Sequence, residues 1–242
     1  YNVIMLMMKL FAELEKKVIK KPSGNVVSIT GGGGKTSFMT EFGSYLRDCG
    51  YSVLLTTTTK IAGPKNHDYK TDYIFDSERI LGYQSMKGRS ALYAERSFDV
   101  KKWISPRLEI LSLLVPRFDV ILIEADGSRG LPIKYHTERD PVIIPETDAV
   151  IGIIGLWAIG HKAYEVAFGD ERDIIVDKQY IESYLEDPEG IAKGMALSYY
   201  NAVLFNGTDI NPESYSGIVY SLKKNSLYEM MPVSVIEDYL YV

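Results

Sequence analysis

Cysteine is almost absent from this chain of 242 residues, which contains only Cys49. One thiol can form neither an intrachain disulfide nor a cysteine-rich zinc cluster. We expect Cys49 to lie near the end of a helix as a small buried side chain. The chain also lacks an apolar run of about 20 residues, and no basic leader with a cleavage site marks its apolar start. We therefore expect a cytoplasmic protein with no membrane partner.

An excess of positive charge is also missing. The net charge is −5 and the sequence pI is about 5.4, which disfavours nucleic acid as a partner. Hydrophobic residues make up 46% and charged residues 24%, as in an ordinary globular protein. The length suits one large domain. We expect residues 1–242 to form a single α/β domain, with an N-terminal helix in residues 1–22 and a C-terminal extension in residues 210–242.

The remaining sequence is organised around the glycine loop, the run Gly31–Gly34 between an apolar strand and a predicted helix. Glycines reach positive φ and keep side chains away, so that backbone N–H groups can surround phosphate oxygens. The helix that opens with Lys35, Thr36 and Ser37 adds its positive end. Lys35 is predicted to reach the outer phosphates, and the Thr36 hydroxyl to bind magnesium.

The loop matches a short phosphate-binding form. The long form, G-x-x-x-x-G-K-[ST], requires glycine where the chain has Ile29, whereas G-x-x-G-K-T fits from Gly31 to Thr36. Mur-type ligases have such a short loop. Partition-type ATPases need a lysine where Thr30 stands, so that class is disfavoured. The alternative is a flexible glycine turn, which the flanking strand and helix make the weaker interpretation.

A second strand, Val53 to Leu55, ends in four threonines and a lysine. Open α/β sheets place ligand groups at such strand ends. We expect Thr58, Thr59 and Lys60 to bind a ligand, although threonine also simply favours strands.

A third apolar strand ends in Glu124, with Asp126 two residues further on the same side. In phosphate-binding-loop proteins a carboxylate here holds magnesium. Glu124 and Asp126 are predicted to hold the metal and orient the attacking water. Arg129, between two glycines, and Lys134 are predicted to stabilise transferred charge. Solvated acids at a strand end are the alternative.

Nucleotide-base recognition is predicted at Asn206 and Asp209, which have the spacing of the N-x-x-D guanine motif, with Gly207 in place of its lysine. Asn-Gly is also an ordinary turn signal, so ATP and GTP both stay open. The histidines have open roles. His136 is a candidate general base, but its proline-punctuated segment is more typical of an interaction loop. His67 and His161 are expected to be inert or structural.

Hydrophobic spacing predicts helices at residues 4–19, 103–114 and 212–224, and mostly helical structure over residues 177–200 with a break at Pro188 and Gly190. Buried strands are expected at residues 26–29, 53–55, 119–123 and 148–155. This alternation favours a three-layer, P-loop NTPase-like α/β fold with a mainly parallel sheet.

Three stretches together resemble the YqeC family, accessory proteins of selenium-dependent molybdenum hydroxylases. They are residues 28–36, 55–61 and 123–134, and residues 138–145 and 203–206 are also similar. The resemblance implies a P-loop fold, nucleotide binding and a role in hydroxylase maturation. It implies a molybdenum hydroxylase or its cofactor-loading machinery as partner, but no established reaction.

The sequence thus predicts a Mg-dependent nucleotide-binding protein, an NTPase or phosphotransferase, that uses ATP or GTP. Lys35, Glu124, Asp126 and Arg129 are the expected catalytic residues. Two alternatives stay open. One is a non-catalytic, nucleotide-responsive module that binds a partner, and the other is a Mur-like ligase or small-molecule kinase.

Overall fold

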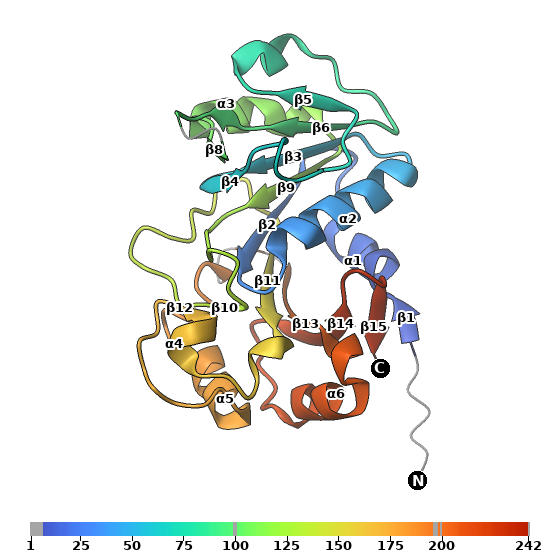
Figure 1. The fold of residues 1–242 in the computed structure, drawn as a ribbon. Helices are drawn as coiled ribbons and strands as arrows, with labels where there is room; N and C mark the ends of the chain where they lie inside the picture. The colour runs from blue at the N-terminus through green and yellow to red at the C-terminus, as the bar shows by residue number, and fades with distance from the viewer. Residues whose placement is uncertain (1–6, 99–100, 196–197, 199, 242) are drawn as a thin grey trace.

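One large sheet forms the centre of the protein in the computed structural model, which describes residues 7–98, 101–195, 198 and 200–241 (Figure 1). Its neighbours are parallel except at the two pairs that involve β15. In spatial order its strands are β1 (Met7–Lys9), β15 (Tyr239–Tyr241), β14 (Glu229–Ser234), β13 (Tyr200–Asn206), β11 (Ala149–Gly155), β2 (Asn25–Gly31), β9 (Val120–Glu124), β3 (Val53–Thr57), β6 (Ser90–Tyr93) and β5 (Tyr73–Phe75).

Helices cover both faces of this sheet because its inner strands are apolar on both sides. Val27 and Ile29 pack with the helices of one face, whereas Val26, the residue before Val27, packs into a cluster on the other face. The first face carries α1 (Leu10–Val18) and α2 (Lys35–Asp48), and the second carries α3 (Leu108–Leu114), α5 (Lys178–Glu186) and α6 (Pro212–Ser221). The expected three-layer α/β fold with a mainly parallel sheet is confirmed.

Smaller elements lie at the carboxyl ends of the central strands. They form two further sheets, seen at the left of Figure 1. One contains β4 (Lys60–Ala62), β8 (Lys102–Ile104) and β7 (Glu95–Arg96), and the other pairs β10 (Ile133–Lys134) with β12 (Ala167–Phe168), next to α4 (Ala163–Val166).

The strand order places a switch point at β2. From β2 the chain passes through α2 to β3 on one side, and from β9 it later crosses to β11 on the other side of β2. Ligands of open α/β sheets bind where the order reverses in this way, at the carboxyl ends of the strands. The glycine loop follows β2 and therefore lies at this position.

Several helix expectations need correction. The first helix begins at Leu10, not at residue 4, because residues 7–9 pair as a strand with β15 at the far end of the chain. Trp103 lies in β8, and α3 begins only at Leu108, after Pro106. Over residues 177–200, α5 ends at Glu186, just before the expected break at Pro188.

Two further differences concern single features. Cys49, expected to be buried, is exposed at the residue after α2. Beyond α6, the C-terminal part forms β14 and β15, which extend the main sheet. Among the described residues, no helix is long and apolar enough to cross a bilayer.

Candidate functional site

The glycine loop makes a turn that only glycine can follow. Gly31, Gly33 and Gly34 have φ of 93°, 58° and 105°. A Cβ on Gly33 would lie 2.2 Å from the backbone nitrogen of Gly155 on β11, so the loop is packed directly against its neighbouring strand. The predicted strand, glycine loop and helix are therefore present, with α2 beginning at Lys35.

The amides of this loop mostly bond within the protein. The N–H of Gly31 donates to Asp126 Oδ2 at 2.7 Å, that of Gly32 to the Ile153 carbonyl at 2.9 Å, and that of Gly33 to the Leu131 carbonyl at 3.2 Å. The residues that follow, Gly34, Lys35, Thr36 and Ser37, line an adjacent cavity. The first N–H groups of a helix have no intrahelical acceptor, so this end of α2 is an anion-binding position.

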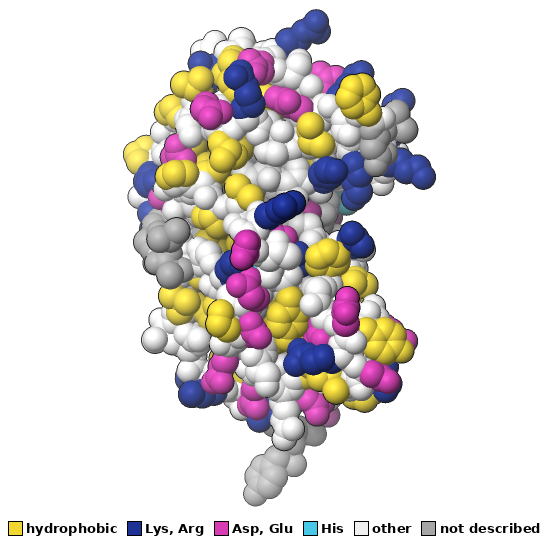
Figure 2. Space-filling model, turned by 90° about the vertical axis from the view of Figure 1, so that its left-hand side faces the viewer, with side chains coloured by type: hydrophobic (Ala, Val, Ile, Leu, Met, Phe, Trp, Pro, Cys, Tyr) yellow, Lys and Arg dark blue, Asp and Glu magenta, His cyan; other side chains and the backbone are white. Residues whose placement is uncertain are grey.

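The α2 cavity, as we call this space, has a volume of about 520 Å³. Its lining includes the carboxyl ends of β9, β13 and β14 and the start of α2, which follows β2. The charged side chains that line it include Lys60, Lys102 and Arg129, together with Glu124 and Asp209. Figure 2 shows the side of the molecule at the left of Figure 1, where Lys and Arg side chains gather along the upper rim of a notch at the margin.

Thr36 and Glu124 meet in the wall of the α2 cavity. The Thr36 hydroxyl donates to Glu124 Oε2 at 2.9 Å. Burial raises the pKa of Glu124, and the charge of Lys35 and the bond from Thr36 only partly offset this. No group of three acidic, histidine or cysteine side chains suited to a metal occurs in the described part of the chain. Magnesium at phosphates commonly takes only one or two protein oxygens, a number that this pair is able to supply.

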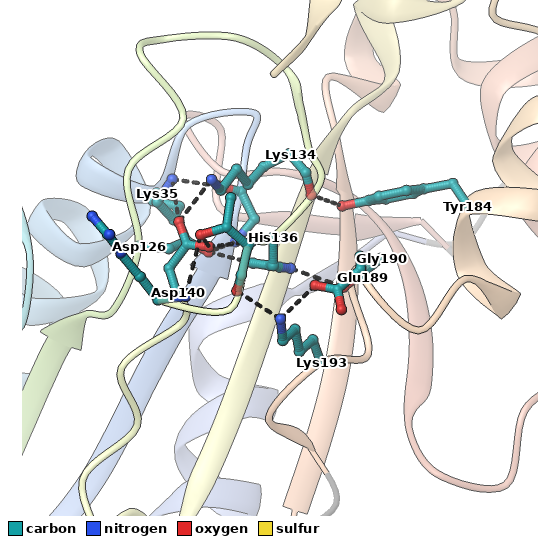
Figure 3. Close-up of polar contacts among 12 residues, drawn as sticks. Lys35, Asp126, Lys134, His136, Asp140, Tyr184, Glu189, Gly190 and Lys193 are labelled. Atoms are coloured by element: carbon teal, nitrogen blue, oxygen red, sulfur yellow. Dashed lines mark hydrogen bonds and ion pairs between the residues drawn. The ribbon is translucent and has the colours of Figure 1, made fainter. Parts of the chain in front are cut away.

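Asp126 bonds to the glycine loop and does not line the α2 cavity, and Figure 3 shows it beside Lys35 and His136. It is fully buried, with Lys35 Nζ 3.0 Å from Oδ1 and His136 Nε2 2.6 Å from Oδ2. Burial alone would raise the pKa of Asp126, but Lys35 and the bond from His136 outweigh it and lower the pKa. Lys35 also donates to the Gly31 carbonyl. Asp126 therefore contacts Lys35 and the glycine loop. The Thr36–Glu124 pair lies elsewhere, in the wall of the α2 cavity.

His136 is buried, and both of its ring nitrogens face acceptors. Nδ1 lies 2.9 Å from the Gly190 carbonyl, and Nε2 faces Asp126. A carbonyl only accepts, and so does an ionised carboxylate, so the ring meets both when both nitrogens donate. His136 is therefore a partner of Asp126 in the interior, and its buried position leaves it away from the α2 cavity.

Lys134 is also buried, with 1% of its surface exposed. Its Nζ lies 2.7 Å from Asp140 Oδ2 and 4.2 Å from the centre of the Phe168 ring. Arg129, in contrast, is exposed at φ 54° with its guanidinium 5.0 Å from the same ring, and it lines the α2 cavity. Of these two cations, the structure brings only Arg129 to the cavity.

Of the residues that follow β3, some line the α2 cavity and others do not. The Thr58 hydroxyl donates to the Val142 carbonyl at 2.7 Å, and Thr58 is not among the residues that line the α2 cavity. Lys60 does line it, and Thr59 lines a neighbouring cavity together with Lys60.

Asn206 and Asp209 both line the α2 cavity, on its β13 side. The Asn206 amide donates to the Gly33 carbonyl at 2.9 Å, and its oxygen accepts from the Val235 N–H at 3.1 Å. Asn206 thus fixes the glycine loop, and Asp209 presents a carboxylate to the cavity.

Sequence reasoning missed Lys102 and the contacts of Asp126. Lys102 lies in β8, whose period-two alternation is too short to detect in the sequence. His136 is ten residues from Asp126, and no sequence spacing indicates that an irregular segment returns it to that carboxylate.

A sequence model of the family described as "YqeC protein" matches residues 27–169, more than half of the chain. The "Uncharacterized protein YqeC" of Escherichia coli (strain K12) is 34% identical over 152 residues, which are 59% of this chain and 56% of that protein. The match therefore spans little more than half the length of that relative.

Among solved structures, a chain of the "MinC:MinD cell division protein complex, Aquifex aeolicus" is similar over 86% of this chain and 80% of that chain. Its TM-score is 0.43 and its sequence identity 15%, a likeness too weak to support a conclusion. The family match, in contrast, covers the glycine loop, the strand that ends in Glu124 and the segment through Lys134, and the chain belongs to the YqeC family.

Proposed function

We propose that this protein binds ATP or GTP with magnesium in the α2 cavity, and hydrolyses or transfers the terminal phosphate. The observation that supports this most directly is the Thr36–Glu124 contact of 2.9 Å beside the N-terminus of α2. A hydroxyl and a carboxylate at this position supply hard oxygen ligands next to an anion-binding helix end.

In this proposal the amides at the start of α2 hold the phosphates. Thr36 and Glu124 would hold the magnesium ion. A magnesium ion bound there would neutralise part of the phosphate charge. Lys35 exchanges part of its contact with Asp126 for a phosphate oxygen, and Arg129 stabilises charge on the transferred group. Asp126 positions Lys35 and the loop. Catalysis then rests on positioning and electrostatic stabilisation.

The metal contact can be tested at Thr36. Thr36→Val removes the hydroxyl at nearly constant volume, and Thr36→Ser keeps it. We expect magnesium to tighten binding of a fluorescent ATP or GTP analogue to the wild type and to Thr36→Ser. Loss of a group at a metal site typically costs ~10- to 100-fold, so Thr36→Val should lose most of this gain. Equal magnesium-dependent binding by Thr36→Val would contradict the proposal.

Base recognition is proposed to fall on Asp209, since Asn206 is bonded to the loop. A carboxylate accepts from the guanine ring, whereas adenine offers no matching pair of donors. Asp209→Asn should therefore weaken GTP binding more than ATP binding if guanine is the base. If Asp209→Asn weakened the binding of GTP and ATP equally, Asp209 would not recognise guanine.

We also propose that the protein acts in the maturation of a selenium-dependent molybdenum hydroxylase. Membership of the YqeC family supports this proposal. In a host that has such a hydroxylase, removal of this protein should lower the selenium or molybdenum content of the purified enzyme. Full content would contradict the role. Restoration by Glu124→Gln, if that variant has lost hydrolysis, would favour the non-catalytic partner-binding module.

A further inference from the structure

A second cavity of about 660 Å³ lies beside the α2 cavity, and we call it the β8 cavity. The two cavities share Lys60, Lys102, Gly127 and Arg129. The β8 cavity alone is also lined by Ile104 and Phe168, among others. None of the described residues that line it is an Asp or a Glu, so its charged groups are all cations.

The two lysines lie on one face of a small sheet. Lys60 is opposite Ile104, and Ala62 is opposite Lys102, in the antiparallel pair of β4 and β8. Because side chains alternate along a strand, both lysines extend from the face that Ile104 shares. Ile61 and Trp103 point the other way, into the main core. The two lysines are diagonal neighbours across this pair, so their long side chains can reach one small anion.

Arg129 completes the cationic wall. It has φ 54°, a conformation that costs a non-glycine residue free energy and that often marks functional sites. Its guanidinium lies 5.0 Å from the centre of the Phe168 ring, which holds it at the border of the two cavities. In the described part of the chain, none of Lys60, Lys102 and Arg129 forms an ion pair. Three cations without an ion-pair partner within 4.0 Å therefore line one apolar-backed space.

We propose that the β8 cavity binds a second, small ligand that has an anionic group and an apolar body. The anionic group, a phosphate or a carboxylate, contacts Lys60, Lys102 and Arg129. The body packs on Ile104 and Phe168. The shared cations place this group next to the α2 cavity, and the charge of Lys102 acts on Glu124 there. The proposal rests on the proposed function, since it gives that nucleotide site a second substrate class.

A simpler explanation is that the three cations serve only the phosphates of the nucleotide. Ile104 and Phe168 distinguish the two, because they line the β8 cavity and not the α2 cavity. An acid placed at Ile104 would repel a ligand of the β8 cavity. It would leave the amides of α2, Thr36 and Glu124 unchanged.

The test uses the full chain with a saturating, non-hydrolysable ATP or GTP analogue and magnesium. Phenyl phosphate and benzoate are titrated as the phosphate and carboxylate probes, with benzyl alcohol as the neutral control, by calorimetry. We expect at least one anionic probe to bind and benzyl alcohol not to bind. Ile104→Glu should weaken that binding at least tenfold, Ile104→Gln less than threefold, and neither should change affinity for the nucleotide analogue.

A surface variant covers the case in which Ile104→Glu does not fold. Lys102→Glu should also weaken the probe at least tenfold. Lys65→Glu makes the same charge change at an exposed lysine outside both cavities and should have less than a twofold effect. Binding that neither Ile104→Glu nor Lys102→Glu changes, or no binding of either anion, would overturn the proposal.

The remaining outcomes separate the two proposals. If the nucleotide analogue abolishes probe binding, the cations serve the nucleotide phosphates and the second ligand is excluded. If the analogue does not bind but a probe binds with the expected variant pattern, the β8 cavity is supported and the proposed nucleotide function fails.

Discussion

At the scale of single residues, two carboxyl groups two positions apart have pKa values displaced in opposite directions. The pKa of Glu124 is raised by burial, and that of Asp126 is lowered because Lys35 and His136 outweigh its burial. Pairs of acids whose environments separate their pKa values commonly have different roles. Here Glu124 lines the α2 cavity beside Thr36, and Asp126 holds the lysine of the loop. The two acids are therefore not interchangeable.

The raised pKa of Glu124 predicts that this site costs stability at neutral pH. Because the folded-state pKa lies above the ordinary value of 4.5, the folded protein binds more protons than the unfolded chain between the two values. Stability then falls as pH rises from about 4.5 through the folded pKa, with a slope of at most ~1.4 kcal/mol per pH unit. Glu124→Gln should raise the free energy of unfolding at pH 7 to 8, with the gain vanishing below about pH 4.5.

Urea unfolding at a series of pH values measures this effect. Glu171→Gln, at an exposed acid outside the site, should give no such pH-dependent gain. Glu124→Gln should also lose magnesium-dependent nucleotide binding, which would identify the lost stability as a cost of function. A variant that is less stable than the wild type at neutral pH would contradict the prediction.

The sequence could predict part of this site. Thr36 comes shortly after β2 and Glu124 ends the neighbouring parallel strand β9. Because the carboxyl ends of such strands meet at one edge, their contact was foreseeable. The partners of Asp126 and Lys134 were not. His136 and Asp140 reach them through an irregular segment whose course depends on tertiary packing rather than on periodicity.

At the scale of elements, the turn from β2 into α2 depends on contact with the chain that follows β9. Leu131 accepts from the Gly33 amide, and the Pro132 carbonyl accepts from the Gly155 N–H. A Cβ on Gly32 would lie 2.5 Å from that same carbonyl. The glycines are thus required for close packing on two sides, in addition to any role toward phosphate.

This packing predicts opposite effects for two glycines of the site. Gly33→Ala places a Cβ 2.2 Å from the Gly155 nitrogen at φ 58°, so it should destabilise the fold by more than about 2 kcal/mol. Gly127→Ala meets only the Thr59 hydroxyl, at an ordinary 3.8 Å, and should be neutral or stabilise by up to ~1 kcal/mol through the unfolded state. Chemical denaturation of both variants measures this, and similar losses for both would show that the loop is not packed as described.

Element type was more predictable than element bounds. The buried strands expected at residues 53–55 and 148–155 are present as β3 and β11, because apolar runs between turn signals are strong indicators. Residues 7–9 became a strand because their partner is β15, more than two hundred residues away, and local spacing contains no information about such a pairing.

At the scale of the whole molecule, the two ends of the chain close the same sheet. β1 pairs with β15, and the Phe11 N–H donates to Asp238 Oδ1 at 2.8 Å. One apolar cluster extends across the sheet, from Leu92 on β6 to Val233 on β14, and includes α1 and α2. The stretch beyond residue 210, expected as an extension, adds strands whose side chains belong to this core. We therefore propose that residues 1–242 form one domain.

A single domain predicts one cooperative unfolding transition, and the two tryptophans allow this to be tested. Trp103 packs against the main core beside β4, whereas Trp157 lies between β11 and the turn at Gly207, on the other side of β2. In Trp103→Phe and Trp157→Phe, each remaining tryptophan reports on one side. For each variant the fluorescence midpoint in urea should coincide with the midpoint by far-UV circular dichroism, because one core links both sides. If instead the Trp157 signal changed at a different urea concentration from the helical signal, the part that contains β13, β14 and β15 would unfold separately and the single-domain proposal would fail.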